Sequence, residues 1–227
     1  MSYRDKLQYL LVKKLNISNV MAKEIILSNM VLVNADFVCD NIKILETDKV
    51  LYKNEIVQDG KKLIYVAIYK PRGIECTLNE NIDQNLATII DFKEKLFPVG
   101  RLDKESEGLL ILTNDGYYFN KTINPKSEVE KEYIVTVNKP IIDDFMEEMS
   151  RGVEVLGKIT LPCIMKKIDE FTFKIILVQG LNRQIRRMCF KLNYMVTSLK
   201  RIRIGKVNIY NLQPGEHRQI SLDELNN

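Results

Sequence analysis

The chain has 227 residues, of which 45% are hydrophobic and 28% charged, and its formal net charge is +4 at pH 7. A soluble globular chain of this length is expected to form one good-sized core and a small second domain. No apolar run approaches the length of a membrane span, and the N-terminus is too polar for a secretory signal. We therefore expect a cytoplasmic protein with no membrane partner.

The cysteines and the histidine argue against the common metal and nucleophile sites. None of the four cysteines forms a CxxC pair or lies near the only histidine, His217. The cysteines are Cys39, Cys76, Cys163 and Cys189. A Cys/His zinc site and a Ser-His-Asp or Cys-His arrangement are thus poorly supported, and reduced, mostly buried thiols are expected. Because no glycine-rich nucleotide motif occurs either, we predict neither a metal nor a cofactor.

The N-terminal part of the chain is predicted to form a small separate module. Helical spacing and short apolar runs predict two helices and two strands, at about 3–15, 18–29, 31–36 and 50–57. Ser18 is the expected N-cap of the second helix. The polar stretch 58–62 is the predicted boundary, which gives an N-terminal domain of residues 1–58 and a larger domain of residues 62–227.

The larger domain is predicted to be α+β, with a sheet built from strands that are far apart in the sequence. Strands are expected at 63–69, 109–112, 131–137, 153–156, 159–168, 171–178, 196–204 and 206–210. Helices or helical turns are expected at 85–92, 117–123, 140–152 and 180–192. Gly152 is the expected C-terminal stop of the third of these helices.

One stretch, GRLDKESEGLLILTNDG at 100–116, carries the main chemical hypothesis. Its apolar run 109–112 predicts a buried strand, and Asn114-Asp115-Gly116 predicts the turn that ends it. Asp103 lies on the loop that enters this strand, where a rigid scaffold can aim a carboxylate. The alternative is a turn-forming Asp that caps its own backbone.

The basic residues are concentrated late in the chain. Residues 1–57 carry eight Lys/Arg and seven Asp/Glu, whereas residues 180–206 carry basic residues and no acid. The basic residues of that block are Arg183, Arg186, Arg187, Lys191, Lys200, Arg201, Arg203 and Lys206. Such a block indicates a polyanionic partner.

These residues together resemble the pseudouridine synthases of the RsuA/RluB/RluE/RluF family over nearly the whole chain. Four motifs occur in the family's order: Lys70-Pro71-x-Gly73, the stretch 100–116, KEYIVTV at 131–137 and LVQGLNRQIRRMC at 177–189. The last motif, continued by NYMVTSLKRIRI at 193–204, is most similar to the RluF type, which isomerises a uridine in large-subunit ribosomal RNA.

The N-terminal module resembles the small alpha-L RNA-binding domain of ribosomal small-subunit protein four. Its second helix opens with Asn19 and Val20 where that family has Ser-Arg, and Asn29 and Ala35 stand where glycines are usual. RNA binding by this module is therefore one expectation, and a packing or orienting role is the alternative.

The resemblance implies a pseudouridine synthase fold, which is a mixed, mainly antiparallel sheet with a central catalytic cleft, and it implies ribosomal RNA as the partner without a cofactor or metal. It places the catalytic carboxylate on Asp103, the base-stacking Tyr on Tyr133 and its basic partner on Arg186. Tyr69, where Asn commonly precedes Lys-Pro, is assigned no role. Tyr133 as an ordinary core residue and Arg186 as a phosphate-binding or solvated helix residue remain the alternatives.

Pseudouridine formation breaks the C1′–N1 bond, turns the uracil over and forms a C1′–C5 bond without redox change. It requires a carboxylate beside the sugar, as nucleophile or as base, and a pocket for the detached uracil. A neighbouring guanidinium favours an ionised carboxylate, so we expect Arg186 to orient Asp103 through a forked contact. Leu102 and Ile185 are predicted to pack around the uracil, or else simply in the core.

Further basic residues are predicted to hold RNA. Arg183 and Arg187 are four positions apart and are expected to share a helix face toward phosphates while Arg186 points inward; a solvated cationic face is the alternative. Arg101 is predicted to enter the space that a flipped uridine vacates, with a scaffold salt bridge as the alternative. The other predicted RNA contacts are Lys70, Arg72, Lys131, Lys200, Arg201 and Arg203.

Two other functions fit the sequence. Transfer RNA is an alternative substrate, because RNA targets are chosen by loop shape and splayed bases. A non-catalytic RNA-binding or ribosome-assembly factor is the alternative from another class, although such a protein has no need of a carboxylate in its basic cleft. The single basic face and the absence of a coiled-coil pattern predict a monomer.

Overall fold

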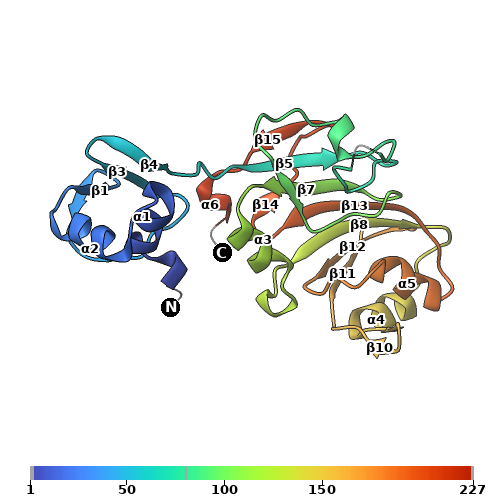
Figure 1. Cartoon of the computed structure of the whole chain (residues 1–227). Helices are drawn as coiled ribbons and strands as arrows, with labels where there is room; N and C mark the ends of the chain where they lie inside the picture. Colours follow the sequence, from blue (N-terminus) through green and yellow to red (C-terminus); the bar gives the residue numbers. More distant parts are fainter. Residues whose placement is uncertain (1–2, 80, 226–227) are drawn as a thin grey trace. The chain divides into compact units, whose positions relative to one another are not determined.

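The computed structural model describes residues 3–79 and 81–225 (Figure 1). The chain divides into two compact units, Met1–Leu63 and Ile64–Asn227. The division falls one residue beyond the polar stretch 58–62. None of the helices within the described ranges is long and apolar enough to cross a membrane.

The first unit packs two helices, α1 (Leu7–Leu15) and α2 (Asn19–Leu27), with a four-stranded antiparallel sheet. The sheet order is β2-β1-β3-β4, and the strands are β1 (Val31–Val33), β2 (Asp36–Val38), β3 (Lys49–Tyr52) and β4 (Glu55–Asp59). Ser18 is the N-cap of α2, as predicted, and its hydroxyl accepts a hydrogen bond from the Met21 amide at 3.1 Å.

Three expectations for this unit are wrong in detail. The predicted single strand 50–57 is a hairpin, because Lys53 and Asn54 adopt φ values of 52° and 65° and turn the chain back. The first helix starts at Leu7 rather than at Tyr3, after the 3₁₀ turn η1 (Tyr3–Asp5). Strand β2 was not predicted, since its three residues are mostly exposed and show no apolar run.

The second unit is built on a nine-stranded sheet. Its main order is β11-β12-β8-β13-β7-β5-β15, with β14 paired to β13 and β6 paired to β7. The strands are β5 (Tyr65–Lys70), β6 (Phe97–Val99), β7 (Glu107–Thr113), β8 (Lys131–Val137), β11 (Ile164–Lys167), β12 (Thr172–Leu177), β13 (Val196–Ile204), β14 (Val207–Asn208) and β15 (His217–Gln219). A separate hairpin joins β9 (Glu154–Val155) to β10 (Lys158–Ile159).

The helices of this unit are short. They are α3 (Gly116–Ile123), α4 (Asp143–Arg151), α5 (Gln184–Lys191) and α6 (Leu222–Leu225), with 3₁₀ turns η2 (Leu86–Thr88) and η3 (Pro125–Ser127). Helices α4 and α5 lie beside the β11–β12 end of the sheet (Figure 1). Their apolar sides, which include Phe145, Met149 and Met188, share a core with Val135 and Phe173 of the sheet. This α+β fold with a mainly antiparallel sheet is the predicted fold class.

One pairing in the sheet is parallel. Strands β7 and β13 run in the same direction, with Lys200 opposite Glu107 and Arg201 opposite Gly108. Gly108 has a φ of +108°, and a Cβ at this position would lie 2.2 Å from the Arg201 carbonyl oxygen. Only glycine therefore allows the two backbones to approach this closely. The parallel β7–β13 pair fixes the loop 100–106 beside β13.

Several predicted boundaries in this unit differ from the structure. The expected strand 159–168 is interrupted, because Thr160 turns inward and its hydroxyl accepts a hydrogen bond from the Val153 amide. The helix expected from Pro140 begins at Asp143, and Gly152 ends it with a φ of +106°, as predicted for its stop. The helix expected from Gly180 begins only at Gln184, because Arg183 has a left-handed backbone with a φ of 51°. Strands β6 and β15 and helix α6 were not predicted.

Candidate active site

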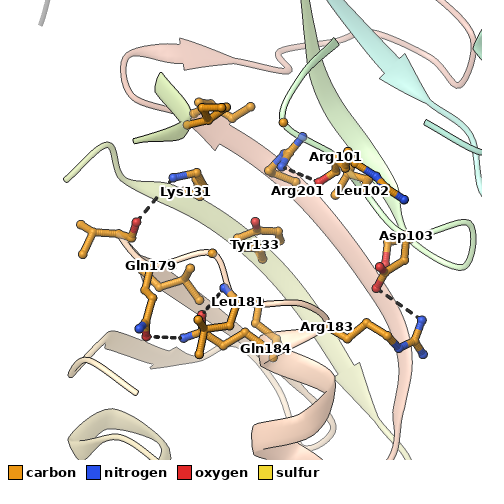
Figure 2. A pocket seen from close by; sticks show the side chains of 18 of the residues that line it. Arg101, Leu102, Asp103, Lys131, Tyr133, Gln179, Leu181, Arg183, Gln184 and Arg201 are labelled. Atoms are coloured by element: carbon orange, nitrogen blue, oxygen red, sulfur yellow. Dashed lines mark hydrogen bonds and ion pairs between the residues drawn. The ribbon is translucent and has the colours of Figure 1, made fainter. Parts of the chain in front are cut away.

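A cavity of about 220 Å³ lies where the loop before β7 meets β8, β13 and the segment that leads into α5 (Figure 2). The loop contributes Arg101, Leu102, Asp103 and Ser106, and the strands contribute Lys131, Tyr133, Leu199 and Arg201. The segment that leads into α5 contributes Gln179, Leu181, Arg183, Gln184 and Ile185. Residues from the central motif and from the late basic block therefore meet around one cavity.

Asp103 is held between two arginines. Its side chain is 27% exposed, and its Oδ2 atom lies 3.5 Å from Arg183 Nη1 and 3.8 Å from Arg186 Nε. Its backbone carbonyl accepts a hydrogen bond from the Ser106 amide at 3.0 Å, which closes a tight turn. Across residues 3–79 and 81–225, no backbone N–H donates to the carboxylate. Asp103 is therefore not a turn cap. It lines the cavity, and its carboxylate points toward Arg183 (Figure 2).

Arg186 points inward, but it does not make the predicted forked contact with Asp103. Its Nη2 donates to the Glu105 carbonyl oxygen and the Ser106 hydroxyl, both at 3.1 Å, and its Nη1 donates to the Val196 carbonyl oxygen at 3.2 Å. These bonds turn the terminal nitrogens away from the carboxylate. Only Nε, which has no hydrogen-bond partner in the described structure, is left to face Asp103.

Arg183 occupies a different place from the one predicted. It is the N-cap residue of α5 rather than a residue inside the helix, so it does not share a helix face with Arg187. Its left-handed backbone sends the side chain toward Asp103 (Figure 2). Arg187 is exposed, and its Nε donates to the Asn182 carbonyl oxygen at 3.0 Å. The two arginines predicted for phosphates are thus separated, one at the carboxylate and one on the surface.

Tyr133 and the two predicted uracil-pocket residues all line the cavity. Tyr133 on β8 is 9% exposed, Leu102 is 6% exposed and Ile185 is 5% exposed. All three belong to the core shared by the sheet, α4 and α5. These three side chains therefore pack in the hydrophobic core and also line the cavity, because the cavity borders that core.

Three of the residues predicted to bind RNA are instead buried or held by carboxylates. Lys70 is fully buried, and its Nζ donates to the carbonyl oxygens of Pro71 and Ile74, each at 2.7 Å. Burial lowers the pKa of Lys70. Arg203 donates to Glu132 at 2.7 Å and to Glu130 at 2.8 Å. Lys70 is thus buried, and Arg203 is partly buried and paired with two carboxylates, so neither side chain lies on the surface as the charge pattern suggested.

Arg201, the third of these residues, is 3% exposed and lines the cavity. Its Nε donates to the Leu109 carbonyl oxygen at 2.7 Å and its Nη1 to the Arg101 carbonyl oxygen at 3.4 Å. Its buried Nη2 has no hydrogen-bond partner among the described residues. Arg201 is therefore not a surface contact, and its side chain is fixed between the β7 strand and the loop that carries Arg101.

The remaining predicted RNA-binding residues are more accessible. Lys131 lines the cavity with its Nζ 2.9 Å from the Val129 carbonyl oxygen, and burial, followed by the charge of Arg201, lowers its pKa. Arg72 forms an ion pair with Glu105 at 3.1 Å, and Lys200 lies 4.7 Å from the centre of the Tyr69 ring. Arg101 is exposed at the cavity, and its side chain makes no ion pair with any residue that the structure describes.

Several residues of the site were not predicted, and two of them are buried polar side chains. Ser106 is 1% exposed and accepts a hydrogen bond from Arg186, and Gln184 is 5% exposed with its Oε1 bonded to the Leu181 amide. Both lie inside quoted motifs, so their position in the sequence was a usable signal. Their chemistry was not, because Ser and Gln are ordinary surface residues unless tertiary contacts bury them.

The comparisons with known proteins agree with this arrangement. A family model described as RNA pseudouridylate synthase matches residues 64–191. The dual-specificity RNA pseudouridine synthase RluF of Salmonella typhi is 45% identical over 168 residues, which cover 74% of this chain and 58% of that protein. The ribosomal small subunit pseudouridine synthase A of Vibrio cholerae is 33% identical over 189 residues and 81% of each chain.

A solved structure gives the same result for the fold. The crystal structure of a pseudouridylate synthase superposes with a TM-score of 0.69 and 25% identity, covering 97% of both chains. The present chain spans 58% of the length of the RluF protein that it matches. The family model nevertheless matches more than half of this chain, and the match to the Vibrio cholerae relative covers 81% of that protein. This chain therefore belongs to the RNA pseudouridine synthases of the RsuA/RluF type.

Proposed function

We propose that this chain isomerises a specific uridine of large-subunit ribosomal RNA to pseudouridine. The observation that supports it most directly is Asp103, a carboxylate held by Arg183 and Arg186 at a cavity whose other charged lining residues are basic. A protein that only binds RNA gains nothing from a negative charge in such a place, because the charge repels phosphates.

In the proposed reaction the C1′–N1 bond of the uridine breaks, the uracil turns over, a C1′–C5 bond forms, C5 loses its proton and N1 gains one. Atoms and electrons balance within the nucleotide. Asp103 is the carboxylate beside the sugar, acting as nucleophile or as base. Arg183 and Arg186 approach its Oδ2 from two sides, so they fix its direction and offset its charge in a partly buried place.

The cavity supplies the other requirement, a place for the detached base. A flipped uracil can stack on the ring of Tyr133, and Leu102 and Ile185 provide the apolar walls. Arg101, exposed at the same loop, would enter the space that the uridine leaves.

The test is pseudouridine mapping by carbodiimide adducts and primer extension, on ribosomal RNA from cells with and without the gene. We expect one large-subunit site to vanish without the gene, to return with the wild-type chain and to stay absent with Asp103→Asn. The substitution removes the charge at constant size, so RNA affinity should be kept while turnover falls by at least a thousandfold.

Transfer RNA is mapped in the same cells, since the RluF relatives are named dual-specificity enzymes. If a pseudouridine is lost from transfer RNA and none from ribosomal RNA, the substrate is transfer RNA and the proposed isomerisation still holds. If both maps are unchanged, the proposed reaction is wrong and the chain is an RNA-binding or ribosome-assembly factor.

A further inference from the structure

A second depression adjoins the cavity that contains Asp103. This groove, of about 500 Å³, is lined by β9, by the outer side of α5 and by the start of β13. Arg183 lines both the groove and the cavity, so the two hollows are neighbours at that residue. Arg186, which faces Asp103 on one side, also lines the groove.

The groove is basic and carries exposed apolar side chains. Four of its lining residues are cationic, Arg183, Arg186, Arg187 and Lys191, and Glu154 is its only acid. Phe190 on α5 is 74% exposed and Met195 is 64% exposed. Helix α5 buries Ile185 and Met188 on its inner side, so Phe190 is not needed for the core.

A single exposed apolar residue needs no explanation, but this one lies between cations. Phe190 has Arg187 one turn before it and Lys191 directly after it, in the same groove. Flat aromatic faces next to phosphate-binding cations are how proteins hold unpaired nucleotides. Arg183 and Arg186 already face Asp103, whereas Arg187 and Lys191 line the groove with Glu154 as the one acid of that lining, which favours a polyanionic occupant.

We propose that this groove binds an unpaired nucleotide next to the target uridine, with its base stacked on Phe190 and its phosphate between Arg187 and Lys191. The proposal builds on the proposed function, because it places the target uridine in the Asp103 cavity and the neighbouring nucleotide beyond Arg183, which lines both hollows. The ligand is single-stranded RNA, and the preference is for a target whose neighbour is also splayed from its helix.

The first test measures binding, so it does not depend on turnover. The full chain is titrated with fluorescein-labelled oligouridylate and with an abasic ribose-phosphate oligomer of equal length and charge. We expect Phe190→Ala to weaken oligouridylate binding about 5- to 100-fold, the range for loss of one stacked base, and to leave abasic binding unchanged. Phe190→Trp should restore wild-type affinity.

Tyr117→Ala is the matched control, because Tyr117 is 80% exposed and lines neither the cavity nor the groove. It should bind both oligomers as the wild type does. The melting temperature of Phe190→Ala should also match that of the wild type, since a side chain this exposed contributes little to the core.

The proposal is overturned if Phe190→Ala binds oligouridylate as tightly as the wild type. It is also overturned if the variant loses affinity for both oligomers equally, which would assign the groove to phosphates or to a protein partner. A different result would disprove the proposed function, namely an unchanged pseudouridine map in both ribosomal and transfer RNA. Because the affinity for oligouridylate is measured without catalysis, the groove proposal and the proposed function can be disproved independently.

Discussion

At the level of single residues, burial separates the four cysteines. Cys39 is exposed, Cys76 and Cys163 are half-buried and Cys189 is buried, so the expectation of mostly buried thiols is wrong for Cys39. Burial raises the pKa of Cys163 to about 11 and that of Cys189 to about 12, and it also raises the pKa of Cys76.

The reactivity of these thiols follows from their ionisation. At pH 8 a thiol with a pKa near 11 is roughly one-thousandth thiolate, and the thiolate is the reactive form. We expect iodoacetamide to label Cys39 first in the folded protein and all four cysteines at similar rates in urea, as followed by peptide mass spectrometry. Labelling of Cys163 as fast as Cys39 at pH 8 would contradict this assignment.

The site residues that could be predicted are those whose role depends on a local motif. Asp103, Tyr133, Leu102 and Ile185 lie around one cavity, where the motifs placed them. The predictions that differ from the structure concern the exposure and the partners of charged side chains. Lys70 is buried with two carbonyl partners, which a count of charges along the chain cannot show. Charge in a sequence reports the presence of a basic residue, while its exposure depends on the tertiary fold.

At the level of secondary structure, the close approach of β7 and β13 depends on Gly108. Adding one methyl group there would bring the new Cβ to 2.2 Å from the Arg201 carbonyl oxygen, at a φ of +108°. We expect Gly108→Ala to lose about 3 kcal/mol or more of unfolding free energy, which is roughly 6–12 °C in melting temperature for a chain of this size.

Gly116→Ala is the control for that measurement. Gly116 starts α3, has no neighbour within 4 Å of an added Cβ and has no positive φ. Its substitution should leave the melting temperature unchanged or slightly raised, since Ala is the better helix former. Equal melting temperatures for the two variants would mean that β7 and β13 can separate without cost.

Strands with a strong periodic or apolar pattern were predicted well. The bounds of β8 and β13 are those expected from the sequence, 131–137 and 196–204. Short strands such as β6 and β15 were missed, because three residues carry too little pattern to separate a strand from a loop. The hairpin at Lys53-Asn54 was missed because it lacks the glycine that usually marks such a turn.

At the level of the whole molecule, each unit has a core of its own. The core of the first unit, which includes Leu7, Leu11 and Val50, contains no residue beyond 63, and the cores of the second unit contain none before 64. We expect residues 64–227 alone to unfold cooperatively and to modify a short hairpin, measured by circular dichroism and by pseudouridine mapping.

The same fragment decides the role of the first unit. Residues 1–57 carry nearly balanced charge, so removing them should change the salt dependence of RNA binding by no more than about one ionic contact. A large loss of affinity for long RNA would assign RNA binding to the first unit, and equal affinity would assign it a packing role. A fragment that melts without cooperativity would show that the units need each other.

The parallel β7–β13 pair also determines when, during synthesis, the sheet around Asp103 can form. Arg201 bonds to Leu109 across 92 positions of sequence, and Arg183 and Arg186 likewise reach back to Asp103. A chain made at about 5–20 residues per second exposes the edge of β7 for roughly 5–20 seconds before its partner emerges. High contact order of this kind slows folding and leaves an unpaired strand open to aggregation. The carboxylate of Asp103 thus gains its arginines only after the chain has been made as far as Arg186, so a nascent chain that ends before Arg183 lacks both of these ion pairs.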